Sequence, residues 1–208
     1  MNLIQFNFDC DNDNMVKLSF DELKSQVKYS LNEFFDVEIE CDGETFNCHQ
    51  VVLSISSPYF RAMFRNTMTE KRTNKVTLKE VESGVVREML HFIYTGATNR
   101  NVLEEKSVEL LAAAERFMMD ELKIICEDYL CANLSIDNAI ENLVLGDYHQ
   151  AHKLSRMAVN VIVQNLGKVV RTEEYQDLKK HHPLLDDLIN NQLQSFFLQQ
   201  KNRPLNCS

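Results

Sequence analysis

The sequence contains no tryptophan, only 3 prolines and only 5 glycines among its 208 residues. So few helix breakers favour long helices joined by short turns, and they argue against a sandwich of many tight hairpins. No apolar run approaches the roughly 20 residues that a membrane span needs. The first residues also lack the basic start and the apolar core of a secretory signal. We therefore expect no membrane partner.

An excess of positive charge is missing as well. The sequence has 22 Lys and Arg against 31 Asp and Glu, a net charge of −9. Because an acidic surface repels phosphate, nucleic acid is not an expected partner. Hydrophobic residues make up 44% and charged residues 25%. This balance is ordinary for a globular chain and provides enough apolar surface for a core.

The sequence also lacks the common motifs of catalysis and metal binding. It has no glycine-rich phosphate loop, no G-x-S-x-G elbow and no H-E-x-x-H helix. No two of its six cysteines have the C-x-x-C spacing of a zinc or redox site. Without a secretory signal, a reducing compartment is the better interpretation, with free thiols that act as small apolar residues. We expect no enzymatic activity, no cofactor and no metal.

The adjacent residues Cys48 and His49 have the types of a thiol nucleophile and its base. A catalytic cysteine, however, needs an electropositive, partly exposed setting and an oriented base. Neighbours that follow a strand usually point in different directions. His149 and His152 lie three apart on an expected helix, where metal binding would need further ligands. We interpret these residues as structural or surface groups.

Hydrophobic periodicity predicts an α+β chain whose second part is entirely helical. In the first part we expect a strand at 3–10, a helix at 20–33, strands at 35–41 and 44–48 joined by Asp42-Gly43, a short buried helix at 51–55, a helix that begins at Pro58 with Ser57 as its cap, and a strand at 75–78. Helices are then expected at 85–94, 102–119, 120–133, 136–146 (capped by Ser135), 150–165, 171–180 and 184–199. The change of composition near residue 133 predicts a domain boundary there.

Several spaced motifs, in the right order, resemble the BTB/POZ domain over roughly residues 20–133. They are Asp36-Val37-x-Ile39, the hairpin at Gly43, Phe46, His49, Val52-Leu53, Ser57-Pro58-Tyr59-Phe60, Met63-Phe64 and Phe92-Ile93-Tyr94-Thr95-Gly96. A closer similarity, to the speckle-type POZ proteins, is carried by Leu110-Leu111-Ala112-Ala113-Ala114, Cys126-Glu127-Asp128 and Cys131-Ala132-Asn133-Leu134-Ser135. Farther on, Leu145-Gly146-Asp147-Tyr148-His149 and His182-Pro183 are similar to the helical BACK-type tail of those proteins.

The resemblance implies four segments. Residues 1–15 would be a linker with a remnant strand, similar to the last strand of a MATH domain. Residues 16–133 would form the BTB/POZ fold, a small β-sheet flanked by helices. Residues 134–199 would form an all-α BACK-like region, and residues 200–208 a disordered tail. The chain departs from the family because residues 1–15 leave no room for a MATH domain, which puts the usual recruitment of substrate in doubt.

The resemblance also implies a function, that of a homodimeric adaptor that binds cullin-3 in a ubiquitin ligase, in the nucleus and/or the cytoplasm. The residues implied in cullin binding are Tyr59, Met68, Glu70, Phe117 and Met118. Core packing is an equal alternative for Tyr59. The amphipathic stripe of Phe20, Leu23, Val27 and Leu31 is expected at the dimer interface, although packing inside its own domain would also explain it.

Other functions are compatible with the same residues. The chain could be an oligomerisation module that pairs with full-length MATH-BTB relatives without binding cullin. A transcriptional repressor unit is a further alternative, although the zinc fingers that usually accompany such units are missing from this sequence.

Overall fold

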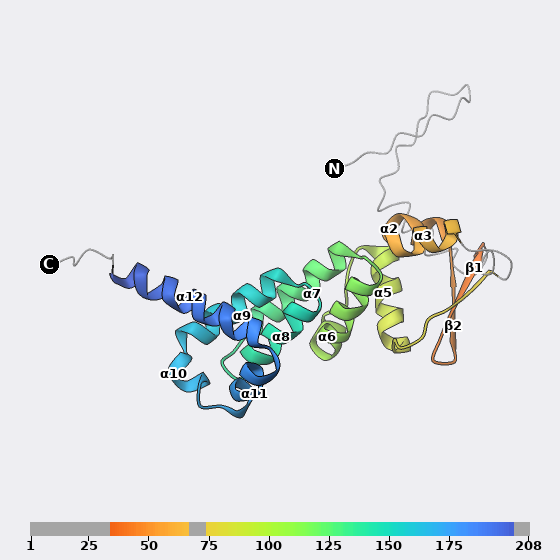
Figure 1. Ribbon diagram of the computed structural model, residues 1–208. Coiled ribbons are helices and arrows are strands. Elements are labelled where there is room, and N and C mark those ends of the chain that lie inside the picture. Colours follow the sequence, from red (N-terminus) through yellow and green to blue (C-terminus); the bar gives the residue numbers. More distant parts are fainter. Residues whose placement is uncertain (1–33, 67–73, 202–208) are drawn as a thin grey trace, which may run out of the picture. The chain divides into compact units, whose positions relative to one another are not determined.

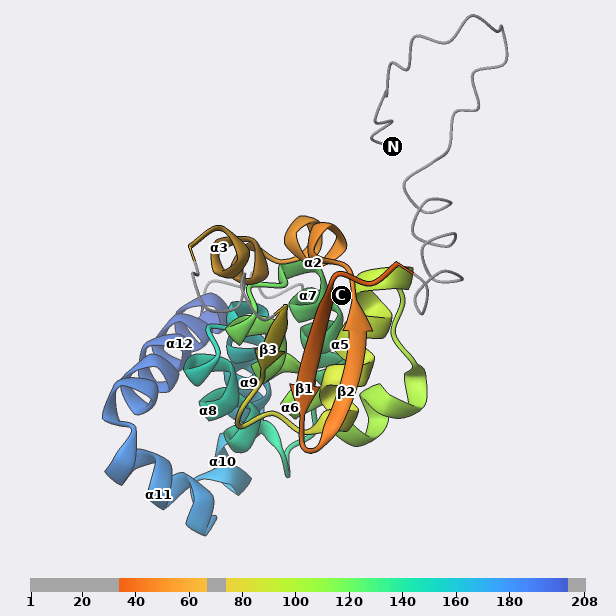
Figure 2. The ribbon, with the colours of Figure 1, turned by 90° about the vertical axis from the view of Figure 1, so that its right-hand side faces the viewer.

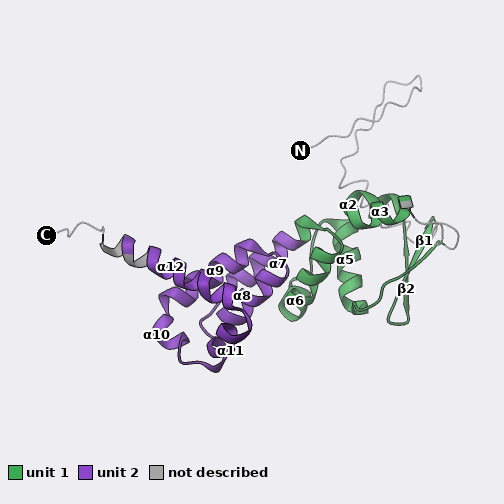
Figure 3. Ribbon diagram, in the orientation of Figure 1, with its two compact units in different colours: residues 1–122 green, residues 123–208 purple. Residues whose placement is uncertain are grey.

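The computed structural model describes residues 34–66 and 74–201 (Figure 1). The chain forms two compact units, residues 1–122 and 123–208, which are called unit 1 and unit 2 below (Figure 3). The strand expected at 3–10 and the helix expected at 20–33 lie outside the described residues. The two compact units divide after Leu122, which is not the position expected from composition. The domain boundary expected at residue 133 stays a prediction.

Unit 1 contains a three-stranded sheet of order β2-β1-β3. Strands β1 (Val37–Cys41) and β2 (Glu44–Cys48) form an antiparallel hairpin, and β3 (Lys75–Thr77) pairs parallel with β1. The hairpin is confirmed at Asp42 and Gly43, whose φ angles of 47° and 77° are the positive values that a two-residue turn of this type requires. Alternate side chains of β1 are buried, so one face of the hairpin packs on the core.

Four helices complete the described part of unit 1, and α5 and α6 lie behind the sheet in Figure 2. They are α2 (Gln50–Ser56), α3 (Pro58–Asn66), α5 (Ser83–Thr95) and α6 (Arg100–Arg116). Helix α5 supplies much of the core, with Val86, Met89 and Ile93 buried. It ends as predicted at Gly96, whose left-handed backbone lets its N–H donate to the carbonyl oxygen of Phe92.

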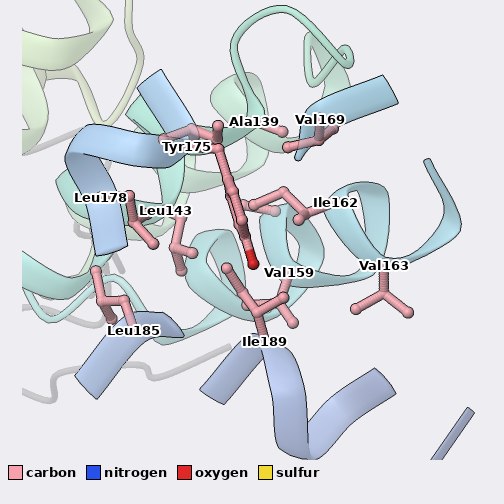
Figure 4. Packing of buried hydrophobic residues seen from close by; sticks show 12 residues of the cluster. Ala139, Leu143, Val159, Ile162, Val163, Val169, Tyr175, Leu178, Leu185 and Ile189 are labelled. Carbon is pink, nitrogen blue, oxygen red and sulfur yellow. The ribbon is translucent and has the colours of Figure 1, made fainter. Parts of the chain in front are cut away.

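All the regular elements in the described residues of unit 2 are helices. Its helices are α7 (Asp120–Ala132), which begins before the division at residue 122, α8 (Ala139–Tyr148), α9 (His152–Gln164), α10 (Leu166–Val169), α11 (Glu173–His181) and α12 (Pro183–Lys201). Its core, shown in Figure 4, is an apolar cluster in which Leu143 of α8, Ile162 of α9 and Ile189 of α12 are completely buried. The mostly helical second part of the chain is therefore confirmed.

In unit 2 the predicted start of one helix was wrong, and one short helix was missed. Helix α8 starts at Ala139 and not at residue 136, because the Asn138 side chain accepts a hydrogen bond from the Ser135 N–H and closes a turn ahead of the helix. The short helix α10 was not predicted at all. A helix of one turn leaves too little periodic pattern in the sequence to be recognised.

The start of α9 is capped by a side chain from another helix. Ala151, at the N-cap position, has no side-chain acceptor for the first amides of α9. Glu127 of α7 supplies one, since its Oε2 accepts hydrogen bonds from the N–H groups of Lys153 (3.1 Å) and Leu154 (3.3 Å). The carboxylate is mostly buried. Helices α7 and α9 are thus joined by a charge-assisted contact at a helix N-terminus.

Candidate functional site

An aromatic cluster joins α3 to the end of α6 in unit 1. The rings of Phe60 and Phe117 are stacked, with centroids 5.5 Å apart and planes at 3°. Tyr59 meets Phe117 edge to face at 5.2 Å, and Phe64 stacks on Phe60 at 6.1 Å. Phe60 and Phe117 are completely buried. Aromatic pairs of this geometry add to the apolar burial of the rings.

Ser57 fixes the backbone at this junction. Its side chain is completely buried, and its hydroxyl donates to the carbonyl oxygen of Phe117 at 2.6 Å. The Ser57 hydroxyl oxygen in turn accepts a hydrogen bond from the Phe60 N–H at 3.2 Å, which confirms Ser57 as the cap of α3. One side chain therefore holds the start of α3 against residue 117.

Met118 follows directly and points outward. Its φ of 54° is a left-handed conformation, which is uncommon for a residue other than glycine. The neighbouring amides are bonded on both sides of it, Phe117 N–H to the Ala113 carbonyl and Met119 N–H to the Ala114 carbonyl. The Met118 side chain is 55% exposed. The end of α6 thus presents an exposed thioether directly after Phe117, whose ring contacts the half-buried Tyr59.

The five residues predicted to bind cullin differ in where the structure places them. Tyr59 and Met118 reach the surface at the same junction. Phe117 is completely buried, so in this structure it supports the surface from below, and its role in cullin binding stays a prediction. Met68 and Glu70 lie outside the described residues, as do the predicted dimer residues Phe20, Leu23, Val27 and Leu31.

A second apolar surface of unit 1 was missed. Val51 and Ile55 stand one turn apart on α2 and are 62% and 53% exposed. Phe34 and Phe35, at the start of the described chain, are exposed as well. The helix at 51–55 was predicted to be buried, but Leu53 is its only buried residue. The spacing of four between Val51 and Ile55 was the available signal for an apolar face.

The pair of Cys48 and His49 is arranged for structure and not for nucleophilic attack. The hydroxyl oxygen of Tyr94 accepts the His49 backbone N–H at 3.0 Å and lies 3.1 Å from His49 Nδ1. Burial raises the pKa of Cys48 to about 12, although the contact with Tyr94 opposes the shift. A thiol that stays protonated at neutral pH is a poor nucleophile.

This environment predicts slow alkylation of Cys48. In the folded chain at mildly alkaline pH we expect iodoacetamide to label Cys48 slower by about three orders of magnitude than in the urea-unfolded chain, because the raised pKa leaves little thiolate. Peptide mass spectrometry after timed labelling measures the rate. Cys126, whose pKa burial also raises to about 12, serves as an internal comparison. Equal rates for Cys48 in both states would contradict the assignment.

Among residues 34–66 and 74–201, no three His, Cys, Asp or Glu side chains come together as they would around a metal ion. No helix in these residues is long and apolar enough to cross a membrane.

The fold and its exposed apolar surfaces define a module for binding other proteins. The family model that matches the chain is that of the BTB/POZ domain, and the match covers residues 25–134, more than half of the chain. The chain belongs to the BTB/POZ domain family, as the spaced motifs predicted. BTB domains generally form homodimers and bind other proteins, so membership of the family indicates a role in protein–protein interaction.

Curated proteins similar to this chain include two TD and POZ domain-containing proteins of Mus musculus. Protein 4 is 35% identical over 152 residues, or 73% of this chain and 41% of the relative. Protein 2 is 34% identical over 154 residues, or 74% of this chain and 42% of the relative. The chain therefore spans about two fifths of the length of these relatives.

Two solved BTB domains also resemble the chain. The BTB domain of zebrafish PATZ1 is 24% identical, with a TM-score of 0.48, and the match covers 57% of this chain and 96% of that domain. The BTB domain of human Gigaxonin is 22% identical, with a TM-score of 0.46 and coverage of 57% and 98%.

Proposed function

We propose that the chain is a homodimeric BTB adaptor that binds cullin-3 and forms part of a ubiquitin ligase in the nucleus and/or the cytoplasm. It would hold other proteins together and perform no catalysis, and it would need no cofactor or metal. In this proposal it is related to the speckle-type POZ proteins and unit 2 corresponds to a BACK-like tail. The observation that carries the proposal is the exposed Met118, which directly follows Phe117, the residue that the Ser57 hydroxyl holds and that the Tyr59 ring contacts.

The chemistry of this junction suits a protein partner. A methionine side chain is flexible and apolar, so it adapts to the surface that covers it. Tyrosine is enriched at interfaces because it combines a large apolar ring with a hydroxyl group. The backbone beneath both residues is already ordered by Ser57, which lowers the entropy that binding has to overcome. Met68 and Glu70 remain proposed members of the same surface.

The exposed apolar residues of α2 support the homodimer. A pair of aliphatic side chains one turn apart, such as Val51 and Ile55, is covered when the same patch of a second copy meets it across a two-fold axis. Phe34 is a further exposed apolar side chain of unit 1. Phe20, Leu23, Val27 and Leu31 are proposed to extend the same interface.

The cullin proposal is tested by calorimetric titration with the purified N-terminal domain of cullin-3. We expect the parent chain to bind and Met118→Asp to weaken binding by at least about tenfold, because the aspartate would lose its hydration in an apolar contact. The control is Met157→Asp, the same change at an exposed methionine of α9 in unit 2. Circular dichroism checks that both variants are folded. Equal binding by Met118→Asp and the parent would remove Met118 from the interface.

The second candidate is an oligomerisation module that pairs with longer relatives and does not bind cullin. It is favoured by the exposed side chains of Val51 and Ile55 on α2, which a second BTB copy would cover without any contact to cullin. Light scattering and the same titration separate the two candidates. A dimeric parent chain that shows no heat of binding with cullin-3 would leave the oligomerisation module as the function.

A further inference from the structure

A cleft of about 360 Å³ opens in unit 2, where the end of α8 and the first turns of α9 line it together with α12. Val159 and Leu185, both buried, and Leu188, 45% exposed, give it an apolar lining. Its volume is at the lower end of the range for ligand pockets. The cleft therefore has room for one bulky apolar group.

The polar lining of the cleft carries an exposed cation, Arg156, that forms no ion pair with the described residues. His152 and Arg156 stand one turn apart on α9, and both are exposed. Within the described residues, neither side chain takes part in a hydrogen bond or an ion pair. Asp147 is the single carboxylate of the lining, and it forms no ion pair with Arg156. A ligand with a carboxylate would give the guanidinium group a partner.

The apolar surface continues beyond the cleft along α12. Leu184 is 80% exposed and lies one turn before Leu188, so the two side chains share a face of the helix. A small molecule that filled the cleft would leave Leu184 in water. A polypeptide segment would cover both leucines, which favours a peptide over a small ligand.

We propose that this cleft docks a segment of a partner protein that inserts one bulky apolar side chain between α9 and α12 and places a carboxylate against Arg156. The amide group of Gln150 and the side-chain carbonyl of Gln192, whose amide nitrogen donates to Asn160 Oδ1 at 3.4 Å, are also in the lining and can bond the backbone of the segment. A basic segment is disfavoured by Arg156. The proposal concerns unit 2 alone and does not depend on cullin binding.

The test is a selection of random 12-residue peptides displayed on phage, with the whole chain as the target and the Leu188→Asp variant as the counter-target. We expect the enriched peptides to combine a leucine or an aromatic residue with a nearby Asp or Glu. A fluorescent copy of the most enriched peptide is then titrated by anisotropy. Arg156→Glu should weaken its binding by at least about tenfold, whereas Arg171→Glu, an exposed arginine of unit 2 outside the lining, should leave it unchanged.

Several results would overturn the proposal. They are the absence of peptides that prefer the parent over Leu188→Asp, enriched peptides without carboxylates, and equal binding by Arg156→Glu and the parent. A lower solution mass for Leu188→Asp than for the parent in sedimentation would assign the cleft to a second copy of the chain. Thermal unfolding by circular dichroism establishes beforehand that each variant is folded, and retained cullin-3 binding by Arg156→Glu would keep this test separate from the function proposed above.

Discussion

Phe117→Ala is expected to lower the free energy of unfolding of unit 1 by about 3–5 kcal/mol. The ring is completely buried and contacts Tyr59 and Phe60, so its removal deletes apolar burial and two aromatic contacts and leaves a cavity between α3 and the end of α6. Guanidinium titration followed by far-ultraviolet circular dichroism measures the change, because the chain has no tryptophan for fluorescence.

The neighbouring residue provides the control for this prediction. Met118→Ala removes a side chain of similar size that is largely exposed, so we expect a change within about 0.5 kcal/mol. A large loss of stability for Phe117→Ala and a small one for Met118→Ala would show that the buried ring supports the fold, whereas the exposed side chain forms the surface. Similar losses for both variants would show that the cluster does not order this junction as described. Met118→Ala should still weaken the proposed contact with cullin-3.

Gly146→Ala is expected to destabilise unit 2 by about 1–3 kcal/mol. A Cβ atom at this position of α8 would lie 2.5 Å from Ser155 Oγ and 2.9 Å from the Ser155 backbone nitrogen on α9. The better helix propensity of alanine, up to about 1 kcal/mol, offsets only part of the strain, since one of the two clashes involves backbone. Thermal and denaturant unfolding of the parent and the variant measure the difference.

Two further variants make this prediction sharper. Gly167→Ala is the matched control, because a Cβ atom there meets nothing within 4 Å, and we expect a neutral or slightly stabilising effect. Ser155→Ala in the Gly146→Ala background should recover only part of the loss, since it removes the hydroxyl and leaves the backbone nitrogen in place. If Ser155→Ala restored the full stability, the clash with the backbone nitrogen would have been relieved by a change in the spacing of α8 and α9, which would contradict this prediction.

Local signals in the sequence were sufficient for much of the fold. Gly43 predicted the hairpin, Pro58 the first residue of α3 and Gly96 the end of α5, and each acts through its own backbone preference. The family resemblance then supplied the arrangement of these elements, which periodicity alone does not give. The start of α8 was missed because Asn138 and Ser135 offered two ways of closing the turn.

The candidate site was less predictable because it depends on contacts between distant residues. Phe117 and Met118 have similar apolar character in the sequence, but the Phe117 ring packs on Phe60 of a distant helix whereas Met118 is exposed. The exposure of Val51 and Ile55 also follows from what α2 packs against and not from its composition. Secondary-structure propensity is a property of each residue type, whereas the burial of a side chain depends on which distant residues pack against it in the folded chain.

The cap that Glu127 provides for α9 bears on how such proteins exchange their parts in evolution. The family match extends to residue 134 and includes α7, yet the carboxylate of Glu127 completes the start of a helix that lies beyond that limit. A gene fusion that replaced everything after residue 134 with an unrelated tail would leave this carboxylate without its amide donors. A tail transplanted without α7 would start α9 with two uncapped amides, at a cost of about 0.5–2 kcal/mol. Recombination at the family boundary therefore disturbs both products, whereas a crossover ahead of α7 keeps the pair together.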